Sequence, residues 1–525
     1  MRINRCGFRT NLSSAFSLLL AAAAVLGSPL AVAQPVQTFL MEQGGVELTE
    51  SNVGQSAIAV QLTCLELIPL SGELTAAGSE LFARCGELVH TADNFNRDGS
   101  SALPRQLGYT DAEELLAAFQ QVNGEEIQAT ANMSQNASNE QFSTIAVRLG
   151  ALRGATSASL TSVTATGAEF MFGSGGGAAA DDGSMPFGPW GWFFRGTYTT
   201  GERDPSDPTS FVGQENGFEF DQYGVTIGID HSSGASVWGV ALAYSSYDLE
   251  MTSQNAGANI QTQVVDAGEI EADSISGTFF YDHSGQDGVY LSALAGYGAQ
   301  TFDMARNFIY FAPSPGVADV VDQTRSLIAA PDGDSLAASL TLGRAIYRGS
   351  FVIDPHLGVT YDRIIIDRYA EVDSGNTNSA NPGAIQDGMQ LAFDEQKINS
   401  RRTNLGIQIS SNINTSFGSV RPTLSADWFH EFENDPRVIK VKYALEDTLA
   451  NDASLPTNGF QTGFDGCVSC FSLTSEEPDS DFIVAGAGIA AATRGGFQTF
   501  LMFEALLGYE KLDAYSVTLG LRGQF

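Results

Sequence analysis

The sequence predicts a mainly β protein, a twelve-stranded antiparallel transmembrane β-barrel that is preceded by a small α-helical region. Three observations predict this fold class. Residues 190–525 contain twelve segments in which apolar and polar residues alternate, as in strands with two different faces. Short turns and long polar loops alternate between these segments. After residue 33, no apolar run approaches the roughly 18 residues of a transmembrane helix, so a membrane protein of this sequence must cross as a barrel.

The first 33 residues are predicted to be a secretory signal peptide. Three arginines precede an apolar stretch at residues 15–26, and a small-x-small site predicts cleavage between Ala33 and Gln34. A membrane anchor is the alternative, but the apolar stretch is short and Gly27-Ser28-Pro29 follows it. The mature chain is therefore expected outside the cytoplasm.

Export makes disulfides the expected state of the four cysteines that remain. Cys64 and Cys85 form one local pair, and Cys467 and Cys470 form the other. The Cys-Val-Ser-Cys motif of the second pair has two alternatives, a redox motif or half of a zinc site. No second cysteine or histidine pair lies near it in the sequence, which favours the disulfide.

Residues 34–137 are predicted to form the small helical region. Two Leu/Ala/Glu-rich segments, 56–67 and 73–92, carry one cysteine each, so a bridge between them would join a helical hairpin. A third helix is expected to begin around Thr110-Asp111, because acidic residues follow in its first turn, and to end by residue 124.

Residues 138–189 are expected to connect the helical region to the barrel. Residues 138–153 have apolar side chains at helical spacing and form a candidate pore helix, from which Arg148 and Arg153 would project. The Gly/Ser-rich stretch that follows, up to residue 189, is a linker by composition.

Residues 190–525 are predicted to form the barrel, with strand centres near residues 194, 225, 240, 279, 293, 340, 359, 405, 424, 485, 501 and 519. One face of each strand suits lipid and the other suits a polar lumen. The final strand is expected to close the sheet against the first, and its apolar face consists of Tyr515, Val517, Leu519, Leu521 and Phe525. Eight polar side chains are predicted to face the lumen: Arg195, Asp354, His356, Asp362, Arg402, Asp427, Glu504 and Arg522.

The even-numbered links between strands are short turns, and the odd-numbered links are mostly long and polar. In outer-membrane barrels the short turns lie in the periplasm and the long loops outside the cell. An even number of strands then places both ends of the barrel sequence on the periplasmic side. The helical region therefore either stays in the periplasm or reaches the surface through the lumen, where there is room for about one helix.

The composition excludes some classes of function. A formal net charge of -35 argues against nucleic-acid binding, which depends on basic side chains. Neither a cofactor nor a metal site is predicted. The Asn94-to-Gly99 segment resembles the start of a calcium loop, but Arg105 occupies the position of the closing acid.

Four segments of the predicted barrel are distinctive: Trp192-Phe-Phe194, Phe218-Glu-Phe220-Asp-Gln-Tyr223, the segment from Arg421 to Phe432, and Leu521-Arg-Gly-Gln-Phe525. In these segments the chain resembles a type V secretion autotransporter. The resemblance implies a barrel in the outer membrane of a Gram-negative bacterium. It also implies that periplasmic chaperones and the barrel assembly machinery, which reads the final strand, insert the barrel, and that the passenger is carried out through the pore.

The chain departs from that family in its passenger. Autotransporter passengers are usually long β-solenoids, whereas this one is short and helical with no internal repeat. The Asn-Asn pair at which some members cleave themselves is absent, so the passenger is expected to remain attached. No nucleophile motif of the passenger esterases occurs, and no catalytic activity is predicted.

The leading hypothesis is therefore a monomeric barrel in outer-membrane lipid, which translocates a helical passenger and anchors it at the cell surface. A passive pore with a periplasmic helical domain is the alternative. A surface hydrolase is a third hypothesis, but none of the histidines lies in a long loop.

Overall fold

The computed structural model describes residues 34–42, 51–68, 74, 76–97, 107–109, 111–124, 127, 129–130, 189–205, 217–252, 267–285, 287–312, 321–374, 388–444, 464, 469–493 and 497–524. Several expectations lie outside these residues. They are the signal peptide up to Ala33, the candidate pore helix with Arg148 and Arg153, the linker up to residue 188, the cysteine Cys467, and the terminal Phe525.

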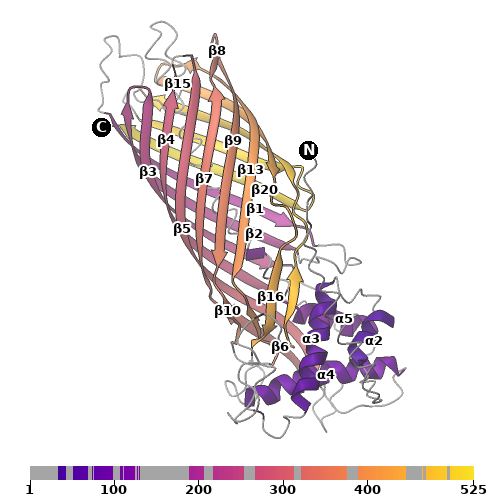
Figure 1. Ribbon diagram of the computed structural model, residues 1–525. Coiled ribbons are helices and arrows are strands. Elements are labelled where there is room, and N and C mark those ends of the chain that lie inside the picture. Colours follow the sequence, from indigo (N-terminus) through magenta and orange to yellow (C-terminus); the bar gives the residue numbers. More distant parts are fainter. Residues whose placement is uncertain are drawn as a thin grey trace, which may run out of the picture.

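The barrel has twelve antiparallel strands, as predicted (Figure 1). They are β1 (Trp190–Arg203), β2 (Phe218–Ser233), β3 (Ser236–Met251), β4 (Gly268–Ser284), β5 (Val289–Ala312), β7 (Asp332–Arg344), β9 (Phe351–Ile366), β13 (Gln396–Ser411), β15 (Gly418–Glu431), β18 (Asp481–Thr493), β19 (Gln498–Leu507) and β20 (Leu512–Gln524). Each pairs with the next, and β20 pairs with β1 so that Leu521 lies opposite Phe194. The prediction that the last strand closes the sheet against the first is confirmed.

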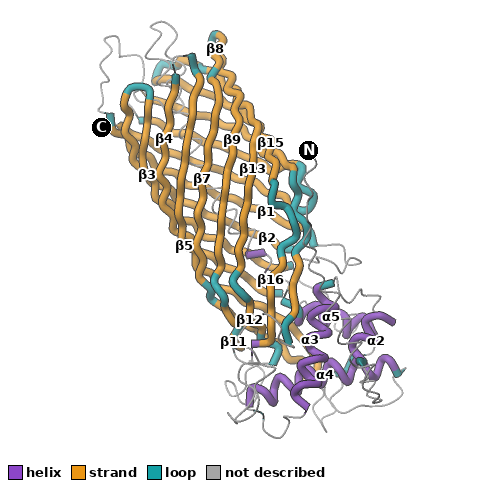
Figure 2. The backbone as a smooth tube through the Cα atoms, in the orientation of Figure 1, coloured by secondary structure: helices purple, strands orange, loops and turns teal. Residues whose placement is uncertain are grey.

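One end of the barrel carries the short turns, and we call it the short-turn end; the other is the long-loop end. Gly234, in the turn after β2, has a φ of +59°, a left-handed conformation that glycine adopts without strain. Two short extensions, β8 (Ile346–Arg348) and β14 (Ile413–Asn414), lie beside turns at the same end. Figure 2 shows that strands form almost the whole wall between the two ends.

The outer face of the wall is apolar and has aromatic residues toward both edges, which is the pattern that a bilayer selects. Exposed aromatic side chains near the short-turn end are Trp190, Trp192, Trp238, Tyr281, Tyr347 and Phe351, and those farther along the wall are Tyr198, Tyr223, Tyr244, Tyr297, Tyr361 and Tyr515. The hydroxyls of Tyr198 and Tyr244 donate to Asp221 and Asp273 on the neighbouring strands, at 2.7 and 2.6 Å.

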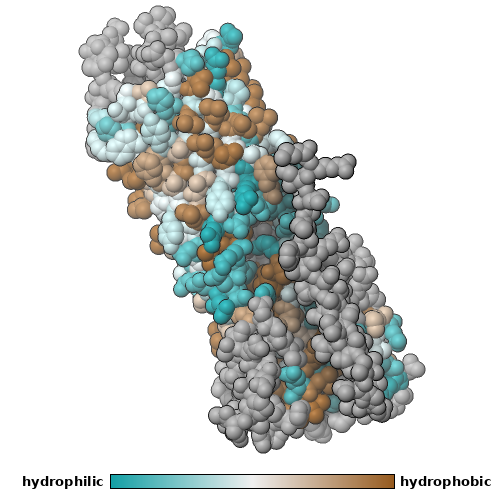
Figure 3. All heavy atoms as spheres, viewed as in Figure 1, coloured by the Kyte–Doolittle hydropathy of each residue, from teal (hydrophilic) through white to brown (hydrophobic). Residues whose placement is uncertain are grey.

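Beyond these tyrosines the strands continue with polar outer faces. β2, β3 and β4 are 16, 16 and 17 residues long, whereas a tilted strand crosses the bilayer with about 9–11 residues. The strand residues beyond this bilayer-spanning length include outward-facing acids, among them Asp248, Glu250, Glu269, Glu271 and Asp303. Figure 3 shows the corresponding change, from brown apolar atoms near the short turns to teal polar atoms farther down the wall. The barrel therefore projects from the bilayer at its long-loop end.

The barrel interior is not uniformly polar, and here the sequence-based expectation is wrong. Near the long-loop end, apolar side chains from six wall strands point inward, and we call them the apolar collar: Phe218, Phe220, Tyr247, Leu249, Met251, Ile270, Ala272, Phe302, Ile364, Ile366 and Ile398. A second apolar group, which includes Phe193, Phe280 and Leu294, lies toward the short-turn end. Most of the polar lumen residues lie between these two apolar zones.

Several long links fold into strands that the sequence analysis did not predict. β5 extends beyond the wall and pairs with β6 (Val321–Ala329), which in turn pairs with β11 (Val372–Asp373). A separate four-stranded sheet consists of β10 (Tyr369–Ala370), β12 (Leu391–Phe393), β16 (Val438–Tyr443) and β17 (Phe471–Thr474). We call it the mouth sheet. It draws on two long links, one between β9 and β13 and one between β15 and β18.

The described part of the chain before the barrel contains four helices: α2 (Pro35–Glu42), α3 (Asn52–Leu67), α4 (Ala76–Asn96) and α5 (Ala112–Val122). Asp111 caps α5 by accepting a hydrogen bond from the Glu114 amide at 3.0 Å, which confirms the predicted start of the third helix. The short α2 was not predicted. Among the described residues, no helix is both long and apolar enough to span a membrane.

A disulfide between Cys64 and Cys85 joins α3 to α4, with 5.7 Å between the Cα atoms, and confirms the predicted hairpin. Cys470 is also disulfide-bonded. Its predicted partner, Cys467, lies outside the described residues.

Candidate functional site at the barrel mouth

The helices lie at the long-loop end of the barrel, against the mouth sheet (Figure 1). A single hydrophobic core contains side chains from the helices and from the long links of the barrel. The helical side contributes, among others, Val53, Val60, Leu67, Leu81, Leu88, Leu115 and Phe119, and the barrel links contribute Leu327, Met389, Leu391, Phe393, Ile439, Val441, Tyr443, Phe471 and Leu473. The core of the helical region is therefore completed by residues that belong to the barrel.

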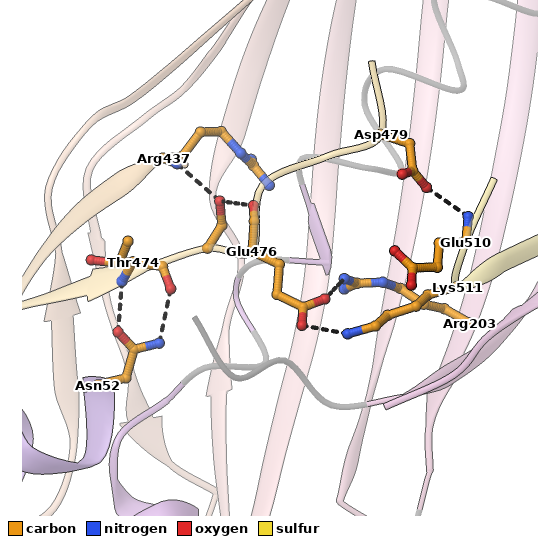
Figure 4. Close-up of polar contacts among 9 residues, drawn as sticks. Asn52, Arg203, Arg437, Thr474, Glu476, Asp479, Glu510 and Lys511 are labelled. Atoms are coloured by element: carbon orange, nitrogen blue, oxygen red, sulfur yellow. Dashed lines mark hydrogen bonds and ion pairs between the residues drawn. The ribbon is translucent and has the colours of Figure 1, made fainter. Parts of the chain in front are cut away.

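Helix α3 covers the edge of the mouth sheet with side-chain amides. Asn52, which is completely buried, donates from Nδ2 to the Thr474 carbonyl at 3.0 Å and accepts from the Thr474 amide at 2.7 Å (Figure 4). Gln55, one turn later, accepts from the Ser472 amide at 3.2 Å. Residues three apart on a helix share a face, and residues two apart on a strand point their backbone groups to the same side. The two amides thus replace a neighbouring strand along β17.

A buried arginine links the helices to the barrel wall. Arg306, on β5, pairs with both carboxylate oxygens of Glu371 at 2.8 and 2.6 Å. The same guanidinium donates to the carbonyl of Gln121 in α5 at 3.0 Å and to the carbonyl of Met389 at 3.3 Å. Glu371 also accepts from the Leu391 amide at 2.8 Å. One ion pair therefore joins the wall, both ends of a long link and the last turn of a helix.

A second polar cluster ties the mouth sheet to the rim of the barrel (Figure 4). Glu476, just after β17, accepts from Arg203 at 2.9 Å and from Lys511 at 2.5 Å. Arg203 ends β1 and Lys511 precedes β20, so Glu476 bridges the two strands that close the barrel. Nearby, Asp479 accepts from the Glu510 amide at 2.6 Å. Burial, followed by the charge of Arg203, lowers the pKa of Arg437, whose backbone amide donates to Ser475 beside this cluster, to about 10.

The eight side chains that were predicted to face the lumen lie on the inner face of the wall. Five of them line a cavity of about 480 Å³: Asp354, His356, Arg402, Asp427 and Glu504. The His356 Nε2 lies 2.7 Å from Asp427, and Arg402 donates to Asp362 at 2.9 Å. Tyr290 donates to Asp354 at 2.9 Å.

The two remaining lumen arginines lie closer to the short-turn end. The guanidinium of Arg195 lies over the ring of Phe500, 4.7 Å from its centre. Arg522 faces Asp230, with 3.8 Å between Nη2 and Oδ1. Most of these lumen charges face an opposite charge or an aromatic ring, so the polar zone is organised by contacts within the wall.

The chain reaches the barrel interior from the long-loop end. Ala129 packs among the residues of the apolar collar and is 5% exposed. Trp190, where β1 begins, lies at the opposite end, because it pairs with His231 beside the first short turn. Residues 131–188, which connect the two positions, lie outside the described part of the chain.

The histidines do not assemble a catalytic triad within the described part of the chain. Ser236 lies 2.9 Å from His283 at the short-turn end, and His430 lies 3.0 Å from Asp481 on the other side of the bilayer zone. A triad requires all three groups together. The described residues also contain no cluster of three or more His, Cys, Asp or Glu side chains that could hold a metal ion.

Residues 192–470 match the autotransporter β-domain family, which is more than half of the chain. The chain belongs to the autotransporter family. This autotransporter is similar to three solved translocator structures, and no curated protein shows significant sequence similarity to it. The NalP domain of Neisseria meningitidis is 13% identical over 64% of this chain and 88% of that one, with a TM-score of 0.41. The Bordetella Brka β-domain is 14% identical over 64% and 99%, with a TM-score of 0.36. The transport unit of AIDA-I from Escherichia coli is 11% identical over 72% and 99%, with a TM-score of 0.33.

Family membership places this autotransporter barrel in the outer membrane, in contact with lipid, and the β-domain itself is not catalytic. The mouth site was missed by sequence analysis. Its clearest local signal is the apolar alternation at 439–443, in which Lys440 and Lys442 separate Ile439, Val441 and Tyr443. Within a long polar link, that alternation predicts a short strand with one buried face.

Proposed function

We propose that this autotransporter barrel translocates a short helical passenger and keeps it, uncleaved, docked on the long loops at the cell surface. The observation that carries the proposal is the shared hydrophobic core at the long-loop end. In outer-membrane barrels the long loops face the outside of the cell. A passenger whose core includes Leu391, Val441 and Leu473 therefore lies on that side.

The path of the chain supports the same proposal. Ala129 is inside the collar at the outer end, and β1 begins at the inner end. The described chain on either side of residues 131–188 therefore lies at opposite ends of the barrel, which is the arrangement expected for a chain that was carried out through its own barrel. The alternative, a passive pore with a periplasmic helical domain, requires the helices at the short-turn end, where none of the described helices lies.

Insertion by the barrel assembly machinery, with periplasmic chaperones, is part of this proposal, as is a monomeric barrel. The closure of β20 on β1 supports the monomeric barrel, because each of the twelve wall strands then pairs with a neighbour on both sides within one chain. Deletion of Phe525 is expected to lower the amount of heat-modifiable barrel in outer-membrane fractions. Unchanged amounts would contradict the role of the terminal strand.

Epitope tags test the placement of the passenger. A tag after Glu42, at the exposed end of α2, is expected to bind antibody on intact cells. A matched control tag at Gly234, in a short turn, is expected to bind antibody only after the outer membrane is permeabilised. Labelling of both tags only after permeabilisation would refute surface display and favour the periplasmic alternative.

A further inference from the structure

We propose that the mouth sheet is the folding partner of the passenger, so that the helices complete their fold only after they reach the outer surface. This inference rests on the proposed function. It adds an order of events, in which barrel closure comes first, the mouth sheet second and the helices last. The order follows from the way that buried contacts are divided between the two parts of the chain.

The helices lack a complete core of their own. The buried side chains of α3, α4 and α5 share one core with Leu391, Phe393, Val441, Tyr443 and Leu473 of the mouth sheet. Helical segments of this total length are marginally stable without staples or a partner, and most helical stability in proteins comes from packing of the apolar face. While the passenger is still in the periplasm, the mouth sheet lies on the other side of the membrane. At that stage the helices have only the hairpin disulfide and an incomplete core.

Buried polar groups of the helices also have their hydrogen-bond partners in the barrel part of the chain. Asn52 is completely buried, and its amide pairs with the backbone of Thr474. The carbonyl of Gln121, in the last turn of α5, accepts from Arg306 of the barrel wall. Without the barrel links these groups would have to remain solvated, because a buried polar group without a partner is strongly unfavourable. An isolated passenger therefore cannot close its core around them.

The mouth sheet in turn depends on closure of the barrel. Glu476 fixes the end of β17 by contacts with Arg203 and Lys511. These two cations belong to opposite sides of the seam between β1 and β20. They come together only when the last strand pairs with the first, so the anchor for the sheet is assembled by the same step that completes the pore.

Matched substitutions in β16 test the inference in the full-length protein with the tag after Glu42. Val441→Asp places a carboxylate in the shared core, where the side chain is completely buried, whereas Val438→Asp places one at a position on the same strand that is 63% exposed. We expect Val441→Asp to leave the barrel heat-modifiable and the tag accessible on intact cells, and protease to digest the helices at least about ten-fold faster than in the wild type. Val438→Asp should match the wild type.

The outcomes separate the two proposals. If the tag is inaccessible on intact wild-type cells, the proposed function fails. If the tag is accessible but the helices of Val441→Asp resist protease as in the wild type, surface display stands and the folding partnership is overturned. If Val441→Asp abolishes the heat-modifiable barrel, the proposed order is overturned, because the sheet would then be needed before closure.

A second variant tests the seam and does not alter the core. Glu476→Gln removes the charge that joins Arg203 and Lys511 while keeping the size of the side chain. We expect faster digestion of the helices with an unchanged amount of heat-modifiable barrel. Wild-type resistance in Glu476→Gln would refute the seam as the anchor of the mouth sheet.

Discussion

Replacing Arg306 by alanine is expected to loosen the docked helices by about 3–5 kcal/mol, the cost of removing one partner from a buried ion pair. The side chains of Arg306 and Glu371 are each 6% exposed, and the guanidinium makes two hydrogen bonds to Glu371, one to Gln121 and one to Met389. The variant leaves a buried carboxylate that keeps the hydrogen bond from the Leu391 amide but has lost its cation. It also leaves the Gln121 carbonyl at the end of α5 without its donor.

An exposed pair in the same group of links is the matched control. Arg368 donates twice to Asp394, at 3.2 and 2.8 Å, but its side chain is 58% exposed. Solvent screening reduces such a pair to at most about 1 kcal/mol, so Arg368→Ala is expected to change stability little. The double variant Arg306→Met with Glu371→Leu is expected to recover most of the lost stability, because apolar side chains of similar volume replace both buried charges.

The assay is pulse proteolysis of the purified full-length protein in detergent at increasing urea concentrations, following cleavage of the helices. With a urea m value of about 1–2 kcal/mol/M for a region of this size, a loss of 3–5 kcal/mol lowers the midpoint by about 1.5 M or more. A shift for Arg306→Ala no larger than that for Arg368→Ala would refute the reasoning. It would mean that water or another group compensates Glu371 when the guanidinium is removed.

Three further predictions use the same urea assay. Asn52→Ala removes both hydrogen bonds to Thr474 and should cost about 1–3 kcal/mol, and a midpoint within error of the wild type would contradict a role for this amide in docking. Removal of the disulfide by Cys64→Ala with Cys85→Ala should cost about 3 kcal/mol, from the loop entropy of a 21-residue separation, and a smaller effect in the purified protein would point to residual structure in the unfolded hairpin. Tyr443→Phe should leave docking unchanged or slightly strengthened at neutral pH, because the buried hydroxyl has no hydrogen-bond partner among the described residues. Burial raises the pKa of Tyr443, so the folded state keeps a proton that the unfolded chain releases near pH 10. The stability of the wild type should therefore fall as pH rises above about 10. This component of the fall should be absent from Tyr443→Phe.

The barrel was predictable from sequence because its strands are long and because one face of each strand contacts lipid while the other faces the lumen. Segments such as 223–229 alternate strictly, since Tyr223, Val225 and Ile227 face lipid while Thr226 faces the lumen. The start of α5 was predictable because its cap is local chemistry between Asp111 and Glu114.

The mouth site could not be predicted in the same way. The strands of the mouth sheet are two to six residues long, too short for a periodic pattern to stand out in a polar link. Their partners are distant, as with Asn52 and Thr474, which are separated by 422 positions. Sequence reasoning also assigned the whole lumen to polar side chains. Where the barrel rises beyond the bilayer, however, the outer face is polar and the inner face near Phe220 and Leu249 is the apolar one.

The amide pairing along β17 also bears on how neighbouring molecules behave in a crowded membrane. An uncovered strand edge offers unpaired backbone groups to any other chain that can add a strand, and such edges promote edge-to-edge aggregation. In this protein Asn52 and Gln55 occupy those groups, so the docked helices protect the loops from self-association. Under the proposed surface display, a cell whose barrel lacked these helices would carry exposed sheet edges on its surface, and clumping of such cells would be the visible consequence.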